Sequence, residues 1–276
     1  MNERATIELT DSNIAAISDM VYKTSGLDIE LNKKELVISR LSQRLSDLDI
    51  DDFNGYLRYI KSDISGKEVN LMAEMLTTNY TLFFREMQHF EFINNNMIEL
   101  IKERKGRFRI WCAGCSTGEE PYSIAMFLND ILGPGYMSNV RILATDISEK
   151  VLKTAMTGIY GDLATKSVPD KFLSKYFRAV SANIHTGYEI SNEIRRNVSF
   201  ARLNLIENWS MEGSFDLILC RNVMIYFDKF TKEKLTKRFY DMLRLNGYFF
   251  TGHSESLTTL NHNFKYVRPA VYQKVF

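Results

Sequence analysis

Ile110–Pro121 reads IWCAGCSTGEEP and decides the fold of the larger part of the chain. An apolar run ends at Cys112, a turn with glycines at positions 114 and 118 follows, and Pro121 leads into the helical pattern of Tyr122–Ile131. A strand, a glycine turn and a helix start are typical of an open α/β sheet, in which ligands bind at the carboxyl ends of the strands. Glycine also lets the backbone approach a bound molecule closely.

The two acids after this turn, Glu119 and Glu120, exclude one common class of ligand. A helix N-terminus attracts anions, and carboxylates placed there would repel a phosphate. The turn reads G-x-x-x-G rather than G-x-G-x-x-G, and Asp146 lies farther along than the ~20 residues of the dinucleotide fingerprint. The sequence therefore predicts a nucleoside cofactor without phosphates rather than NAD, and S-adenosylmethionine is the first candidate.

Composition excludes several other classes of protein. The 276 residues, 45% of them hydrophobic, suit one large domain or two smaller ones. The net charge of +1 gives no general attraction to nucleic acid or to anionic membranes. Because no apolar run approaches about 18 residues, we expect no membrane insertion. The polar, acidic N-terminus does not resemble a signal peptide, and the 3 cysteines fit a reducing cytoplasm.

The first part of the chain reads as one helix after another, with no strand–helix alternation. Apolar residues recur at helical spacing, and Thr10 or Asp11 and Gly26 fit a helix start and stop. We expect an all-helical domain over residues 1–76, followed by a linker with a connecting helix over residues 77–105. The expected helices after Gly26 are Lys33–Leu48, Phe53–Ile60 and Val69–Leu76.

From residue 106 to residue 276 strand-like runs alternate with helical runs, which predicts an α/β domain with a mostly parallel sheet. The expected strands are Phe108–Cys112, Val140–Thr145, Phe215–Cys220 and Gly247–Thr251, and the expected helices are Pro121–Ile131, Glu149–Met156 and Lys229–Leu245. The alternation in Phe264–Phe276 fits a closing hairpin or edge strand. Short β-prone pieces over residues 176–203, around Tyr176–Val180, Gly187–Ile190 and Val198–Leu203, predict a small antiparallel insertion.

Polar residues at the ends of these strands are candidates for a site. Asp146 could accept hydrogen bonds from a ribose diol, or it could cap the helix that begins near Ser148. Arg221 and Asn222 follow another buried strand, although Asn222 could instead cap the next turn. These positions favour a ligand at the carboxyl edge of the sheet.

Thr77–Phe90 mixes polar and aromatic residues just before the sheet domain. One interpretation is an amphipathic helix whose aromatic side chains pack between the domains. The alternative is a polar wall of a pocket, with Arg85 placed to make a bidentate contact with a carboxylate. The residues alone do not separate these two interpretations.

Other chemistries find little support. Cys112 and Cys115 are spaced as C-x-x-C, but a zinc site needs about four ligands. The third cysteine and the histidines at 89, 185, 253 and 262 show no metal-ligand spacing, so we expect no metal and no redox function. No G-x-S-x-G elbow is present, which argues against a serine hydrolase.

Taken together, these stretches resemble the chemotaxis receptor glutamate methyltransferases of the CheR family. The resemblance rests on motifs in the same order over nearly the whole chain: TNYTLFFRE, WCAGCSTGEEPYSIAM, ILATDIS, FARLNL, LILCRNVMIYFD and GYFFTGHSESL. It implies a small all-helical N-terminal domain and a Rossmann-like S-adenosylmethionine-dependent methyltransferase domain with a small antiparallel β insertion. The product of the cofactor would be S-adenosylhomocysteine.

The resemblance also implies roles for particular residues. Arg85 and Tyr226 would act in catalysis, with Tyr226 close to the transferred methyl group. Asp146 would hold the ribose, and Asn204 and Leu205 would flank the adenine. The full set of implied cofactor contacts is Asn79, Thr81, Arg85, Glu119, Asp146, Asn204, Leu205, Arg221 and Asn222.

The implied reaction is transfer of a methyl group to glutamate side chains of chemoreceptors, forming methyl esters during sensory adaptation. A glutamate with a pKa of about 4.3 is anionic at neutral pH, so it needs no general base, and no catalytic His or Cys stands out. The implied place of action is the cytoplasm, at receptor arrays on the inner face of the membrane. Rival hypotheses are a methyltransferase for nucleic acid or a small molecule, and a non-catalytic cofactor-sensing module.

Two further features concern the partner. Lys33, Lys34, Arg40 and Arg44 form a basic strip that is either a solvated face or, by the resemblance, a contact for the acidic methylation helices of receptors. Some family members tether a receptor's C-terminal pentapeptide through a glycine-rich loop in the β insertion. The corresponding turn here, residues 181–187, has a single glycine, which argues against tethering.

Overall fold

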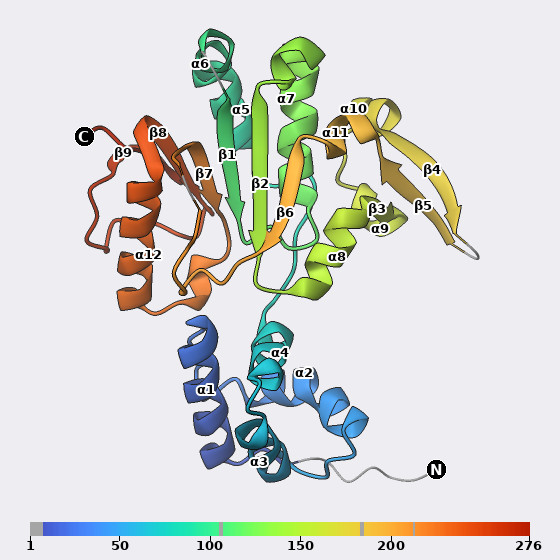
Figure 1. The fold of residues 1–276 in the computed structure, drawn as a ribbon, viewed down its shortest axis with the longest axis vertical. Helices are drawn as coiled ribbons and strands as arrows, with labels where there is room; N and C mark the ends of the chain where they lie inside the picture. The colour runs from blue at the N-terminus through green and yellow to red at the C-terminus, as the bar shows by residue number, and fades with distance from the viewer. Residues whose placement is uncertain (1–7, 105–106, 183–184, 212) are drawn as a thin grey trace. The chain divides into compact units, whose positions relative to one another are not determined.

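The computed structural model describes residues 8–104, 107–182, 185–211 and 213–276 (Figure 1). The chain divides into two compact units. The first contains residues 8–78 together with Tyr226–Thr231, and the second contains Asn79–Ile225 and Lys232–Phe276.

The first unit is helical, as predicted. Thr10 caps the first helix by accepting a 3.2 Å hydrogen bond from the Asn13 N–H, and Gly26 ends it at a φ of 75°. Apolar residues at helical spacing form the buried core, including Ile14, Ile17 and Leu41. The helices are α1 (Asp11–Ser25), α2 (Lys34–Asp47), α3 (Phe53–Ser62) and α4 (Lys67–Leu76).

A segment distant in sequence joins this helical unit. Phe227 forms an antiparallel β-bridge with Leu27, and the Asp28 N–H donates a 2.8 Å hydrogen bond to the Tyr226 carbonyl. The backbone at Tyr226, which ends the short 3₁₀ helix η1 (Met224–Tyr226), is therefore held by the turn that follows α1.

The second unit is built on a mixed sheet with the strand order β6-β2-β1-β7-β8-β10-β9. Strands β6 to β8 in this order are parallel to their neighbours, and β10 and β9 form the predicted closing antiparallel hairpin. The strands are β1 (Phe108–Ala113), β2 (Val140–Asp146), β6 (Val198–Arg202), β7 (Phe215–Cys220), β8 (Leu243–Thr251), β9 (Lys265–Arg268) and β10 (Val271–Gln273). The chain runs from β1 to β2 on one side and returns to β7 on the other, so the loop after β1 lies at the topological switch point.

Helices pack along this sheet (Figure 1). The predicted helices after the glycine turn and after β2 are confirmed, and the first of them is kinked where Gly133 has a φ of 74°. The connecting region forms two short helices rather than one. The helices are α5 (Met87–Asn96), α6 (Ile98–Glu103), α7 (Glu119–Met137), α8 (Glu149–Thr157) and α12 (Lys229–Met242).

The core lies on both faces of the sheet, as a mainly parallel sheet requires. Ile110 and Cys112 of β1 belong to the hydrophobic cluster that includes residues of α5, α6 and α7. Trp111, which lies between them, packs instead against Phe239 of α12, at a ring distance of 5.3 Å. Its indole N–H donates a 2.9 Å hydrogen bond to the Thr145 hydroxyl of β2. Alternate residues of one strand thus bury into two different layers.

The small antiparallel sheet has the strand order β3-β5-β4, which confirms an insertion but corrects its composition. We expected Val198–Leu203 to belong to it, and this was wrong, because Val198–Arg202 is β6 and pairs in parallel with β2. A β-prone pattern does not specify which edge a strand joins; here Val198 is buried against β2. The elements of the insertion are β3 (Ile159–Gly161), α9 (Asp162–Thr165), α10 (Asp170–Tyr176), β4 (Phe177–Ala182), β5 (His185–Ile190) and, after it, α11 (Asn192–Arg195).

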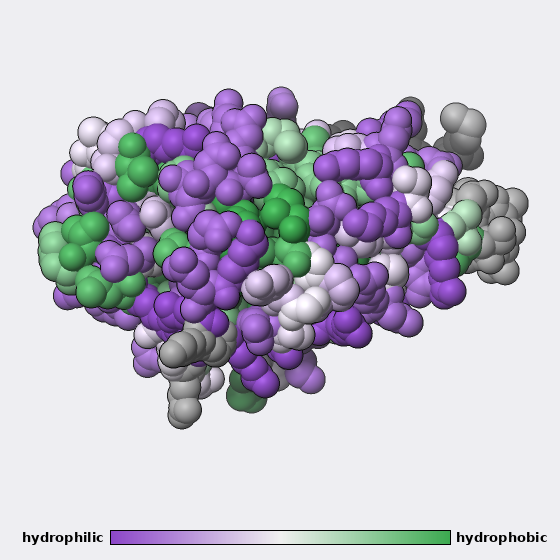
Figure 2. All heavy atoms as spheres, turned by 90° about the horizontal axis from the view of Figure 1, so that it is seen from above, coloured by the Kyte–Doolittle hydropathy of each residue, from purple (hydrophilic) through white to green (hydrophobic). Residues whose placement is uncertain are grey.

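Two surface properties bear on partners. None of the described helices combines the length and the apolarity that crossing a bilayer requires. The face shown in Figure 2 is mainly hydrophilic, and its apolar side chains form small scattered groups rather than one broad patch.

Candidate active site

The loop after β1 is shaped by its glycines. Gly114 and Gly118 have φ values of 84° and 96°, and Ser116 between them has a φ of 49°. A Cβ at Gly118 would lie 2.9 Å from the Ala155 Cβ, and a Cβ at Gly114 would overlap the side chain of Val223. The N–H groups of residues 114 and 115 both donate to the Thr145 carbonyl, at 2.8 and 2.9 Å. The loop is thus fixed against the end of β2 in a conformation that needs glycine.

Asp146 joins this loop to the next one. Its Oδ2 accepts a 2.8 Å hydrogen bond from the Ser116 N–H, and its Oδ1 accepts a 3.0 Å hydrogen bond from the Ser148 N–H. The hydroxyl of Ser148 caps α8, so Asp146 is not the helix cap, which was one of the two roles that the sequence allowed for it. Burial raises the pKa of the Asp146 carboxyl, and the hydrogen bonds from Ser148 and Ser116 act against this rise. An ionised carboxylate offers about four acceptor positions, so this one can also accept from a diol.

The two acids after Gly118 have different partners. The carboxylate of Glu119 is buried at the start of α7 and accepts from the Thr117 hydroxyl at 2.7 and 2.9 Å. Glu120 instead accepts a 2.8 Å hydrogen bond from Nη1 of Arg221. Burial raises the pKa of both carboxyls, and for Glu120 the Arg221 charge opposes the rise. Glu119 is therefore the acid of the pair without a cationic partner in this hydrogen-bond network.

Arg221 is buried at the end of β7 and binds protein groups with all its nitrogens. Besides Glu120, it donates from Nε to Glu86 Oε2 at 3.2 Å and from Nη2 to the Arg85 carbonyl at 2.6 Å. This set of contacts, the Arg221 clasp, connects the end of β7, the start of α7 and the segment before α5. Sequence reasoning treated Arg221 as a direct cofactor contact and did not single out Glu86 or the clasp role of Glu120. Glu86 follows Arg85 and Glu120 follows Glu119 in the sequence, and this adjacency is the signal that could have pointed to the two glutamates.

The segment before α5 is not the amphipathic helix that one interpretation suggested. No helix covers residues 77–86, and Phe84 and Glu86 have left-handed φ values of 55° and 60°. Phe84 stacks on Phe172 at 4.6 Å within the second unit, so the aromatic side chains anchor the segment there. The Asn79 carbonyl accepts a 2.9 Å hydrogen bond from the Ser116 hydroxyl.

This anchoring leaves Arg85 half-buried. Its Nη1 donates a 3.2 Å hydrogen bond to the Tyr80 carbonyl, and its guanidinium lies 5.8 Å from the Tyr80 ring centre. Thr81 is half-buried in the same segment, and Asn79 is exposed. The structure thus brings the Asn79 backbone to the glycine loop through Ser116, and the part of Thr81 and Arg85 in a pocket wall stays a prediction.

Asn204 and Leu205 lie in the turn after β6. The Leu203 N–H donates a 2.9 Å hydrogen bond to the Asp146 carbonyl, which brings this turn beside the end of β2. The Asn204 side chain donates to Glu207 at 3.0 Å and accepts from the Ile206 N–H at 3.2 Å. Both predicted residues are buried, and Asn204 shapes its own turn.

Asn222 is held by a glutamate that sequence reasoning missed. Its φ is 58°, and its N–H donates a 2.6 Å hydrogen bond to Glu255 Oε2. Glu255 also accepts from the Ile225 N–H at 3.1 Å and from the Gly252 N–H at 2.6 Å. Burial raises the pKa of this carboxyl, and hydrogen bonds from backbone N–H groups, those of Gly252 and Asn222 first, oppose the rise. Glu255 therefore fixes the turn that follows Arg221. Its position in the stretch GHSES is the sequence signal that could have pointed to this residue.

The basic strip lies in the helical unit, and its members differ in their surroundings. Arg44 forms a 2.5 Å ion pair with the buried Glu68, and Arg40 donates a 2.8 Å hydrogen bond to the Thr77 carbonyl. Lys34 pairs with the exposed Asp11 at 2.5 Å, and Lys33 is exposed. The charge of Arg44 is thus used inside the unit, whereas the two lysines remain at the surface.

The described cysteines, Cys112, Cys115 and Cys220, are free and buried. Burial raises the pKa of each thiol well above its ordinary value, which removes the reactive thiolate. The turn that bore on tethering contains Asn183 and Ile184, which lie outside the described residues.

A loop that needs glycine, a carboxylate at Asp146 that can accept from a diol, and carboxylates where phosphate would be repelled together fit S-adenosylmethionine. Residues 79–272 match the family described as CheR methyltransferase, SAM binding domain, and residues 12–77 match CheR methyltransferase, all-alpha domain. The chain belongs to the CheR methyltransferase family. Its second unit is therefore an S-adenosylmethionine-binding methyltransferase domain, and its helical unit is the all-alpha domain of that family.

Curated CheR relatives match over nearly the full length of the chain. The chemotaxis protein methyltransferase of Escherichia coli is 37% identical, over 99% of this chain and 93% of its own. The protein of the same name from Salmonella typhimurium is also 37% identical, over 96% of this chain and 91% of its own. That of Borreliella burgdorferi is 35% identical, over 97% and 96%.

Proposed function

We propose that this protein transfers the methyl group of S-adenosylmethionine to glutamate side chains of chemoreceptors, forming methyl esters. The observation that carries the proposal is the match to both CheR domains, together with relatives named chemotaxis protein methyltransferases. Its place of action would be the cytoplasmic methylation helices of receptors, at arrays on the inner face of the membrane.

The chemistry suits the residues present. Bound S-adenosylmethionine would supply a methyl group on a cationic sulfur, which an ionised carboxylate can accept without a general base. The protein's part is to position the reactants and exclude water, so the rate depends on alignment. A site built from backbone turns, carboxylates and a clasped arginine segment meets this need without a catalytic His or Cys.

In this proposal Asp146 binds the ribose diol, and Glu119 binds a donor group of the cofactor. Arg85 and Tyr226 position carboxylates, either that of the substrate or that of the cofactor. Arg221 acts through the clasp, by holding the Arg85 backbone. The remaining contacts would come from Asn79, Thr81, Asn204, Leu205 and Asn222.

The proposed receptor contact is the basic strip. Lys33 is exposed, and Lys34 is half-buried and pairs with the exposed Asp11 at 2.5 Å. Both lysines would attract an acidic helix, and Arg40 would contribute through its half-buried side chain. Arg44 belongs to the proposed strip, but its ion pair with Glu68 gives it a structural task as well.

The test is incubation of the full chain with radiolabelled S-adenosylmethionine and receptor-containing membranes. We expect label on receptor protein that is released by mild base, as methyl esters are. Asp146→Asn should raise the Kd for the cofactor and lower this labelling, whereas the exposed Asp162→Asn should not. Label on added RNA, or cofactor binding with no protein label, would contradict the proposal.

A further inference from the structure

A second cluster of functional side chains lies beside the clasp. Glu86 and His89, at the start of α5, meet His253, which follows β8. One ligand atom from each residue, a carboxylate oxygen or an imidazole nitrogen, lies within 4.8 Å of the other two. The spacing of these residues in the sequence gave no sign of this meeting, because the fold brings position 253 to positions 86 and 89.

His89 is the unusual member of the cluster. Its side chain is 2% exposed and stacks on Phe250 at a ring distance of 4.7 Å. Among the described residues no hydrogen bond of ordinary geometry reaches either ring nitrogen, although a contact with the Ala270 backbone outside those limits acts to raise the pKa of the ring against the effect of burial. Buried polar atoms are nearly always paired, and a bound ion is one of the recognised reasons for an exception. A metal ion would give one of these nitrogens the partner that it lacks.

The distances are close to those of a coordination sphere. Glu86 Oε2 lies 3.6 Å from His89 Nδ1 and 3.7 Å from His253 Nε2. Ligand atoms at the corners of a tetrahedron, with metal bonds of about 2.0–2.1 Å, lie about 3.4 Å apart. Small side-chain rotations would therefore bring the two imidazoles and the carboxylate around one ion.

The surroundings select the kind of ion. Glu86 Oε2 also lies 3.2 Å from the Arg221 guanidinium, so its negative charge is partly used. Mg²⁺ and Ca²⁺ prefer sites made of oxygen ligands, and this cluster offers two nitrogens and a shared carboxylate. Imidazole suits Zn²⁺ and its neighbours in the first transition row, which bind nitrogen strongly.

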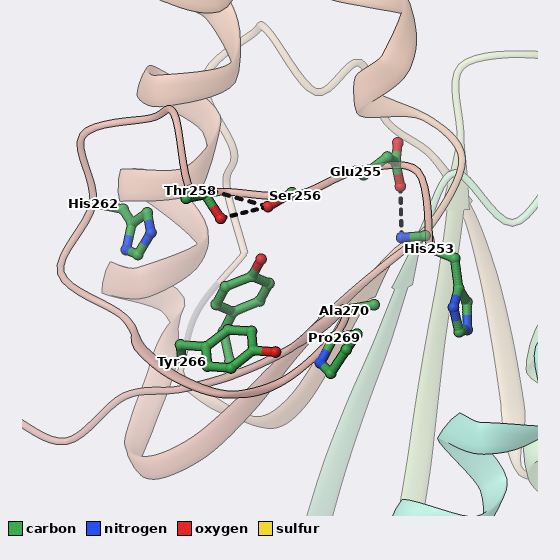
Figure 3. A pocket seen from close by; sticks show the side chains of 10 residues that line it. His253, Glu255, Ser256, Thr258, His262, Tyr266, Pro269 and Ala270 are labelled. Carbon is green, nitrogen blue, oxygen red and sulfur yellow. Dashed lines mark hydrogen bonds between the residues drawn. The ribbon is translucent and has the colours of Figure 1, made fainter.

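We propose that Glu86, His89 and His253 form a binding site for a Zn²⁺-class transition-metal ion, with a fourth coordination position open to water. The His253 side chain is 39% exposed, which gives the ion a route from solvent. His253 also borders a pocket of about 530 Å³, and Figure 3 shows its ring at the opposite end of this pocket from the ring of His262. His262 is therefore a histidine of the same region that lies outside the cluster.

The test measures metal bound to the untagged full chain after chelator treatment and dialysis against micromolar Zn²⁺. We expect one ion per chain, and Co²⁺ in its place should give the visible absorption of a four-coordinate site. His253→Ala should weaken binding by about 10-fold or more, since it removes a direct ligand. Glu86→Gln should also weaken it, and His262→Ala should bind as the wild type does.

The controls separate the site from other causes. Cys112, Cys115 and Cys220 are buried, so they do not compete for the ion. His253 is partly exposed, so its replacement can be checked for an unchanged melting temperature without metal. Absence of a stoichiometric ion in the wild type, or equal affinity in the wild type and His253→Ala, overturns the proposal. Neither outcome depends on which substrate the enzyme methylates.

Discussion

Arg221 Nη1 donates a 2.8 Å hydrogen bond to Glu120 Oε2, and this contact fastens the end of β7 to the first turn of α7. The guanidinium is buried and also bonds to the Arg85 carbonyl, so one cation holds elements that are far apart in the sequence. A buried ion pair adds little net stability over an apolar pair of the same shape, but losing one partner is costly. The clasp is therefore better understood as a device that fixes the position of Arg85.

Removal of the clasp should destabilise the protein. In Arg221→Met the carboxylates of Glu86 and Glu120 lose their buried cation, and we expect the free energy of unfolding to fall by about 3–5 kcal/mol. The measurement is urea unfolding of the full chain. The double variant Arg221→Met with Glu120→Gln should recover part of this loss. No recovery would show that the contact between these two residues does not carry the effect.

Arg85→Ala should reduce methyl transfer while leaving the fold intact, because its half-buried guanidinium bonds to the carbonyl of Tyr80, a neighbour in the same segment. We expect turnover to fall by roughly 100-fold, the size of effect that misplacement of a reactant can cause. Arg85→Lys keeps the charge but loses the planar fork, so it should restore only part of the rate. Arg58→Ala, at an exposed arginine of the helical unit, is the control. Turnover equal to the wild type in Arg85→Ala would contradict the catalytic role.

Gly118→Ala should impair the loop that the cofactor needs. A methyl group there meets the Ala155 Cβ at 2.9 Å, and the φ of 96° is strained for any other residue. We expect a loss of about 1–3 kcal/mol in stability, with weaker binding of S-adenosylmethionine by calorimetry. Gly135→Ala, with nothing within 4 Å of the added carbon, should change neither quantity. Equal effects in the two variants would remove the special role of Gly118.

The Arg44–Glu68 pair should make stability depend on acid. Burial alone would raise the pKa of Glu68, but the hydrogen bonds from Arg44 and Tyr56 outweigh it, so its pKa is lowered on folding. The stabilisation is present above the unfolded pKa of about 4.3 and is lost as pH falls through the folded pKa. Between pH 3 and 6 the free energy of unfolding should therefore change less steeply with pH in Glu68→Gln than in the wild type. Parallel pH dependences would argue against this pair.

Reversal of the Lys33 and Lys34 charges should act on the receptor step alone. In the double variant Lys33→Glu, Lys34→Glu, we expect slower receptor methylation at low salt and unchanged cofactor affinity, because screened surface charges govern encounter. The difference should shrink as salt is raised. Lys61→Glu with Lys67→Glu changes the net charge equally at other exposed positions and is the control. If both double variants behave alike at low salt, the strip is only a solvated face.

Local patterns predicted the elements of this fold well where one residue decides a boundary. Thr10 and Gly26 delimit α1, and the turn from Gly114 to Gly118 separates β1 from α7, because capping and left-handed φ values are local properties. The same patterns failed for Val198–Leu203. Its β-prone residues predicted a strand but could not distinguish the edge of β2 from the small sheet.

The residues of the candidate site also divide into those that local patterns indicated and those that they missed. Asp146 was singled out because a strand end followed by a polar loop can be recognised locally. The structure bonds its carboxylate to the Ser116 N–H, and its contact with a ribose stays a prediction. The carboxylates of Glu86 and Glu255 were missed, because their partners at Arg221 and Asn222 lie on other elements. Nothing in the neighbouring residues tells a buried, paired carboxylate from an exposed one.

The sequence by itself determined the helical unit, the alternation of strands and helices, and the glycine turn with its acids, since each depends on residues a few positions apart. Tertiary structure alone decided which buried charges meet. It placed Arg221 between Glu86 and Glu120, and it brought His253 to His89. The physical reason is that the state of a buried charge or imidazole depends on the groups that surround it in space. Parallel strands joined by long crossover connections bring together residues that are far apart in the sequence, and no local pattern records which residues meet in this way.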